Sequence, residues 1–196
     1  MRDADVRRVL RAEIDAAHAA DHDTRVVEEL ALEHGTSRVD IAVINGEIHG
    51  YEIKSERDTL ERLPKQIELY SLVLDKVTLV VGARHLSHAQ EIIPPWWGIR
   101  VAELRGGSVV LSPERSEEVN PSPDALTIAM LLWREEALEE LEARGLARGV
   151  RSKPRRAVYE RLVSGMSLPD LRHLVRCRLK NRANWRVAEP LVSCGD

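Results

Sequence analysis

The stretch SRVDIAVINGEIHGYEIK, residues 37–54, decides the fold of this 196-residue chain. Two runs rich in β-branched residues flank Asn45-Gly46, and an Asn-Gly pair in that setting is the strongest short signal for a β-hairpin. An acidic side chain interrupts each run, Asp40 in the first and Glu52 in the second. Ionised side chains are poor strand residues and costly to bury unpaired, so something must neutralise these two.

The register of this hairpin decides whether the two acids can act together. A two-residue loop would place Asp40 and Glu52 on opposite faces of the sheet, because side chains alternate along a strand. A three-residue loop over Asn45–Glu47 pairs Asp40 with Glu52, and a bulge at Gly50 would shift the register equally well. We therefore predict a three-residue loop or a bulge.

Hydrophobic spacing on both sides of the hairpin predicts alternating helices and strands. Residues 25–32 suit either a helix end or a strand. The other expected elements are helices over 3–19, 64–75 and 84–92 and strands over 76–82, 99–104 and 108–111. This order implies an α/β fold with a mixed sheet.

The remainder of the chain predicts a second module. Residues 112–123 are rich in Ser, Pro and Glu, which is typical of a linker. Beyond them we expect helices over 124–143, 154–164 and 167–181. The predicted organisation is a core over 1–111, the linker, and a helical module over 124–196.

Charge divides the chain unevenly. Residues 1–143 carry a net charge of −12, whereas residues 144–186 carry +11. A basic module on an acidic body indicates an anionic partner such as nucleic acid, unless the basic helices simply dock on the acidic body. The candidate nucleic-acid contacts are Arg151, Lys153, Arg155, Arg156, Arg176, Arg178 and Lys180.

Composition narrows the class of protein. Hydrophobic residues make up 43% and charged residues 31% of the chain, as in globular proteins. The two cysteines, Cys177 and Cys194, form neither a disulfide framework nor a zinc pattern, which favours a reducing compartment. No apolar run approaches the ~20 residues of a membrane span. We expect a cytoplasmic protein without a membrane partner, and the oligomeric state stays open.

The second strand of the hairpin also holds a lysine. Glu52 and Lys54 share one face of that strand, since only Ile53 separates them. One explanation is a plain salt bridge from Lys54 to Glu52 or Asp40. The other is a hard cation held by carboxylate oxygens, with Lys54 beside its bound water.

Three motifs, RVDIAV, EIK and QIELY, together resemble the PD-(D/E)xK, restriction-endonuclease-like nuclease superfamily. The resemblance is greatest to its RecB-like branch, which carries a Q-x-x-x-Y motif after the E-x-K strand. The chain is also similar to small uncharacterised bacterial proteins regarded as predicted nucleases. The resemblance covers about residues 25–82, and Val39 stands where the family's motif has proline.

This resemblance implies a metal site. Asp40 and Glu52 would bind Mg²⁺ or Mn²⁺, with Glu29, or alternatively Glu28, as a further acid. Lys54 would orient or activate the attacking water and stabilise developing phosphate charge.

The resemblance further implies that Gln66 and Tyr70, four apart on one helix face, support the site or contact DNA. The expected function is metal-dependent hydrolysis of phosphodiester bonds, with DNA favoured, in repair or in a mobile-element or phage setting. The alternative is a catalytically silent nucleic-acid-binding or assembly protein that keeps the nuclease fold.

Overall fold

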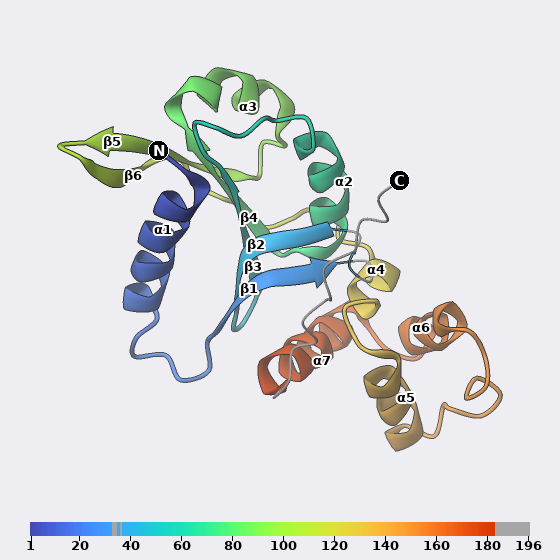
Figure 1. Ribbon diagram of the computed structural model, residues 1–196. Helices are drawn as coiled ribbons and strands as arrows, with labels where there is room; N and C mark the ends of the chain where they lie inside the picture. Colours follow the sequence, from blue (N-terminus) through green and yellow to red (C-terminus); the bar gives the residue numbers. More distant parts are fainter. Residues whose placement is uncertain (33–34, 36, 183–196) are drawn as a thin grey trace, which may run out of the picture.

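The computed structural model describes residues 1–32, 35 and 37–182, and shows one six-stranded sheet with helices on both faces (Figure 1). The strands lie side by side in chain order: β1 (Arg25–Leu32), β2 (Ser37–Ile44), β3 (Ile48–Lys54), β4 (Lys76–Gly82), β5 (Gly98–Arg105) and β6 (Ser108–Arg115). The β3–β4 and β4–β5 pairs are parallel and the others antiparallel. The predicted α/β class with a mixed sheet is confirmed.

The hairpin has the three-residue loop that the sequence predicted. Ile44 of β2 pairs with Ile48 of β3, and the side chain of Asn45 accepts the backbone N–H of Glu47 at 3.1 Å. The loop alone sets the register, so no bulge is needed at Gly50. A Cβ at Gly50 would lie 2.6 Å from Leu74 Cδ1, so this glycine allows close packing instead.

Helix α1 (Asp3–Ala17) covers one face of the sheet (Figure 1). Its buried side chains Val6, Leu10 and Ile14 pack with Ile41 and Val80 of the strands. The opposite face packs against α2 (Leu63–Val73) and α3 (Leu86–Ile92), and the short η2 (Ala83–His85) directly precedes α3. No helix in the described part of the chain is long and apolar enough to cross a bilayer.

The C-terminal part is helical, with α4 (Ala125–Ala129), α5 (Arg134–Ala143), α6 (Arg155–Ser164) and α7 (Leu168–Asn181). The single helix expected over 124–143 is wrong, because the chain turns after Met130 and α5 starts afresh. The side chain of Glu136 accepts the Trp133 N–H at 2.7 Å and so caps that new start.

These helices share one continuous hydrophobic core with the sheet. Leu132, Leu141 and Val175 of the helical part belong to the same cluster as Ala42 and Val77 of the strands. Strand β6 extends to Arg115, four residues beyond the expected run, because it stays paired with β5. The expected core and module boundaries therefore fall inside one packed unit.

A buried carboxylate ties the helical part to the sheet. The Asp75 side chain is 6% exposed; its Oδ2 accepts the Ile48 N–H at 2.7 Å, and its Oδ1 contacts the Arg172 guanidinium. Arg176 lies 4.0 Å from the same carboxylate. The Asp75 backbone carbonyl accepts the Asn120 N–H at 2.8 Å. Asp75 therefore joins β3, α7 and the segment before α4.

Replacing Asp75 by asparagine should lower the free energy of unfolding by about 3 kcal/mol, because Arg172 and Arg176 lose a buried countercharge. The matched control is Asp15→Asn on α1, whose exposed pair with Arg11 is worth less than about 1 kcal/mol. Urea unfolding of both variants measures the difference. Equal losses in the two variants would contradict the anchoring role of Asp75.

Candidate functional site

Glu52 is the centre of a buried polar cluster at the end of β3. Its side chain is 2% exposed, and Oε1 accepts hydrogen bonds from Lys54 Nζ and, at 2.6 Å, from Gln66 Nε2. The Tyr70 hydroxyl lies 2.7 Å from Oε2. Three residues that the sequence singled out therefore converge on Glu52.

Helix α2 presents Gln66 and Tyr70 on one face, as their spacing predicted. Pro64 lies in the first turn of this helix, and Tyr70 is fully buried, stacked on Trp97 with ring centroids 6.0 Å apart. The Tyr70 hydroxyl is also 2.6 Å from the Arg38 carbonyl oxygen. Burial, and next the charge of Glu52, raise the pKa of Tyr70 far above its ordinary value, so its hydroxyl stays protonated.

Asp40 lies across the hairpin from Glu52. Ile41 pairs with Tyr51, and the same register places the preceding residue of β2, Asp40, opposite the following residue of β3, Glu52. Its Oδ2 accepts the backbone N–H of Ile53 at 2.7 Å, so the carboxylate lies beside β3 where the strand ladder ends. Its Oδ1 accepts a hydrogen bond from Arg7 Nη2 at 2.7 Å. The side chains that contact Asp40 come from the α1 side, whereas those around Glu52 come from α2.

The two carboxylates nevertheless act on each other. Burial raises the pKa of Glu52, and the negative charge of Asp40 raises it further, while the charge of Lys54 opposes the rise. Carboxylate oxygens are the ligands that Mg²⁺ prefers, and Mg²⁺ keeps several waters and needs few protein ligands. The donor chemistry of Asp40 and Glu52 therefore fits a hard divalent cation.

The third acid that the sequence predicted does not join Asp40 and Glu52 in the structure. Glu29 of β1 lies opposite Asp40 but reaches Arg7, at 3.4 Å, with half of its side chain exposed. Glu28 pairs with Arg11 of α1 at 2.9 Å. Among the described residues, no three His, Cys, Asp or Glu side chains form a group that could hold a metal ion.

Glu29 has a left-handed backbone, with a φ of 53° that disfavours a residue with a Cβ. The alternation of side chains breaks here on both strands: Val27 and Leu30 of β1, and Val39 and Ala42 of β2, pack in the same cluster although each pair is three apart. This break turns Glu29 towards Arg7 on the α1 side.

A family model described as "Bacteriophage P4 protein cII" matches residues 7–187 of this chain. The chain belongs to the bacteriophage P4 protein cII family. Protein cII of Enterobacteria phage P4 is 25% identical over 160 residues, which cover 82% of this chain. This chain spans about 60% of the length of that relative.

One solved structure is also similar, the SPO1766 protein of unknown function from Silicibacter pomeroyi. It is 21% identical, and the match covers 73% of this chain and 94% of that chain with a TM-score of 0.39. A superposition this loose carries no argument about function. The region matched by the P4 cII family model, by contrast, includes every candidate residue from Arg7 to Lys180.

The predicted nucleic-acid contacts of this cII-family chain fall into two groups, of which the first is on α7. Arg178 pairs with Glu139 of α5 at 2.8 Å, and Lys180 pairs with Asp23 at 2.6 Å. Arg176 faces the buried Asp75. The charges of α7 are therefore met inside the chain, as expected if basic helices dock on an acidic body.

The second group lies on the loop between α5 and α6 and on the first turn of α6. Lys153 and Arg155 are exposed, and no acidic side chain of the described ranges lies within 4.0 Å of either. Within the part of the chain that the structure describes, Arg156 pairs only with Glu160 of its own helix, at 2.8 Å. Arg151 pairs with Glu142, at 3.0 Å. This basic loop, residues 148–156, presents positive charge to solvent.

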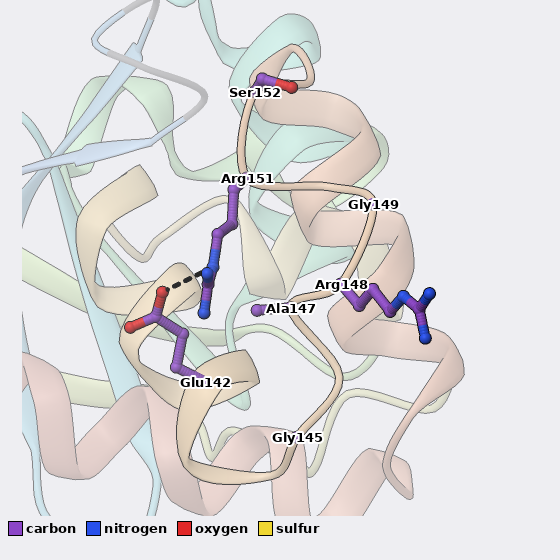
Figure 2. Close-up of a pocket in the computed structure, with 7 residues that line it drawn as sticks. All are labelled: Glu142, Gly145, Ala147, Arg148, Gly149, Arg151 and Ser152. Carbon is purple, nitrogen blue, oxygen red and sulfur yellow. Dashed lines mark ion pairs between the residues drawn. The ribbon is translucent and has the colours of Figure 1, made fainter.

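A cavity of about 340 Å³ opens within this basic loop (Figure 2). Its lining residues are Glu142, Gly145, Ala147, Arg148, Gly149, Arg151 and Ser152. Figure 2 shows the ion pair of Arg151 and Glu142 on one side, while the Arg148 side chain points away from both. None of the lining residues belongs to the cluster around Glu52.

Sequence reasoning missed Arg7. No motif in the sequence includes this residue. The one available signal was position, since Arg7 adjoins Val6 and lies three residues before Leu10, both of which are buried on the sheet. Its pairing with Asp40 depends on how α1 docks, which the sequence does not encode locally.

Replacing Glu29 by glycine should raise the free energy of unfolding by roughly 0.5–1 kcal/mol, because glycine adopts a left-handed φ without strain. Glu28→Gly in the neighbouring strand position should lower it by roughly the same amount, since Glu28 has no such backbone. Chemical denaturation distinguishes the two signs. A loss of stability in both variants would show that Glu29 stores no strain.

Proposed function

We propose that this protein is a metal-dependent nuclease that hydrolyses phosphodiester bonds, with DNA as the favoured substrate. One observation carries the proposal: Asp40 lies across from Glu52 in a hairpin whose second strand also supplies Lys54. The bracing of Glu52 by Gln66 and Tyr70 supports it, because the PD-(D/E)xK motifs resembled by this sequence include both residues.

Each residue has a role that its contacts allow. A bound divalent cation polarises a phosphate oxygen and makes a water more acidic. Asp40 and Glu52 would hold it. Lys54, whose ammonium is next to Glu52, would donate a hydrogen bond to the attacking water and to the developing phosphate charge. Tyr70, buried and protonated, fixes the position of Glu52.

The basic loop, residues 148–156, is the surface we assign to the nucleic-acid backbone. Its exposed Lys153 and Arg155 are available to phosphates, whereas the basic residues of α7 already have acidic partners. Phosphate contacts of this kind give affinity without sequence preference. The relative in phage P4 supports a mobile-element setting for this activity.

Labelled single- and double-stranded DNA and RNA, incubated with Mg²⁺ or Mn²⁺, should be cut by the wild-type protein. Lys54→Ala should lose activity by about a hundredfold or more, because the transition state loses a positioned donor. Lys65→Ala is the matched control, since Lys65 is an exposed lysine of α2. Nucleic-acid binding without cleavage by any of these proteins would favour the silent binding or assembly protein.

Mg²⁺ should raise the melting temperature of the wild-type protein, because ligand binding stabilises the native state. Asp40→Asn should abolish both the increase and the cleavage while the protein remains folded. Differential scanning fluorimetry with and without the metal measures this. An Asp40→Asn variant that cuts at the wild-type rate would refute the metal-site assignment.

Neutralising Lys153, Arg155 and Arg156 together to glutamine should weaken binding to all DNA sequences alike. The dependence of log affinity on log salt should flatten by about 0.9 per lost phosphate contact on duplex DNA. Arg178→Gln with Lys180→Gln is the matched control and should leave the salt slope unchanged. A triple variant with a lower melting temperature and unchanged affinity would assign the loop a structural role instead.

A further inference from the structure

We propose that Arg7 is a displaceable clamp on Asp40, and that a divalent cation reaches Asp40 only when the Arg7 guanidinium is released. The inference rests on the proposed function, because it takes Asp40 as a ligand of the cation. It adds a residue from α1 that neither the motifs nor the family resemblance includes.

The contacts of Arg7 favour this role. Its Nη2 lies 2.7 Å from Asp40 Oδ1 and its Nη1 lies 3.0 Å from the Asp40 carbonyl oxygen, so the guanidinium grips one residue at two points. Nη1 is also 3.4 Å from Glu29, and Nε is 3.3 Å from Asp3. Arg7 therefore forms ion pairs with acidic side chains of α1, β1 and β2.

The clamp and a cation compete for the same oxygen. Asp40 Oδ2 is used by the Ile53 N–H, which belongs to the backbone of the sheet and cannot move away. Arg7 holds the other oxygen, Oδ1, so a cation that binds there has to come close to the guanidinium. A divalent cation beside a fixed guanidinium would also be repelled, so the two positive charges exclude each other.

Arg7 cannot leave by losing its proton, because a guanidinium stays charged at every pH a protein tolerates. Its release therefore requires a competing charge at Asp40 and cannot come from deprotonation of Arg7 itself. The left-handed backbone of Glu29 is a second, independent sign of a built contact, since it turns this carboxylate towards Arg7 at a cost in strain.

The test compares Arg7→Gln with the matched control Arg11→Gln. Arg11 is on the same helix and pairs with Asp15 and Glu28 but does not contact Asp40. Isothermal titration calorimetry with Mn²⁺, and separately with Mg²⁺, measures the dissociation constant for each protein. We expect about tenfold tighter binding for Arg7→Gln, and a value within about twofold of wild type for Arg11→Gln.

Thermal unfolding gives a second measurement. Without metal, Arg7→Gln should melt below wild type, because Asp40 loses its partner. With Mg²⁺, its melting temperature should rise by more than that of wild type. If Arg7→Gln does not fold, the unmodified protein still tests the clamp, since Mg²⁺ should shift the Arg7 side-chain Nε–Hε signal in NMR spectra and leave that of Arg11 in place.

The outcomes separate the two proposals. Equal metal affinity in wild type and Arg7→Gln, or weaker affinity in the variant, would overturn the clamp while the metal site stands. An Arg7 signal that Mg²⁺ does not move, in a protein that binds Mg²⁺, would do the same. No measurable metal binding by either protein would overturn the proposed metal site itself, and the clamp with it.

Discussion

The register of the β2–β3 hairpin is the constraint on which the rest of the structure depends. Because Ile44 pairs with Ile48, Ile41 and Val43 face α1 while Ala42 and Ile44 face the larger core on the other side. A shift by one residue would exchange these faces and bury the wrong side chains. The same register brings Asp40 opposite Glu52 at the end of the strand ladder, while the break in side-chain alternation beside Val39 accompanies the contact of Arg7 with Asp40 from the α1 side.

Two buried carboxylates, Asp75 and Glu52, bind the elements around the hairpin through different partners. Asp75 is satisfied by a backbone N–H and by arginines of α7, so its charge fastens the helical part onto the sheet. Glu52 is satisfied by a lysine, an amide and a hydroxyl, yet its pKa is raised by burial and by Asp40. A carboxylate whose pKa is raised by burial and by a second acid is typical of a functional site, and this supports the proposed role of Glu52.

The sequence was informative where interactions are local. The hairpin loop, the strand holding Glu52 and Lys54, and the Gln66–Tyr70 face each follow from spacing within a few residues. The expected helix over 124–143 was wrong because the cap that starts α5 depends on Glu136 reaching back to Trp133, which helical periodicity does not reveal. Arg7 and the partition of the basic residues lay beyond prediction, since both depend on which acidic side chains the tertiary fold brings near each arginine.

The division of the basic residues into a paired group on α7 and an exposed group before α6 gives the charge asymmetry of the chain a physical explanation. The positive charges of α7 meet carboxylates of α5, of the α1–β1 connection and of Asp75, and they stabilise the association of the helices with the acidic sheet. If every basic residue of the C-terminal part were paired with an acidic side chain in this way, the positive net charge of that part would indicate nothing about a partner. The loop before α6 differs because Lys153 and Arg155 stay exposed without an acid in range among the described residues, although carboxylates are plentiful on α5 nearby. Exposed like charges repel one another and gain little from the fold. A cluster of them beside an acidic body therefore supports the proposed contact with a nucleic-acid backbone.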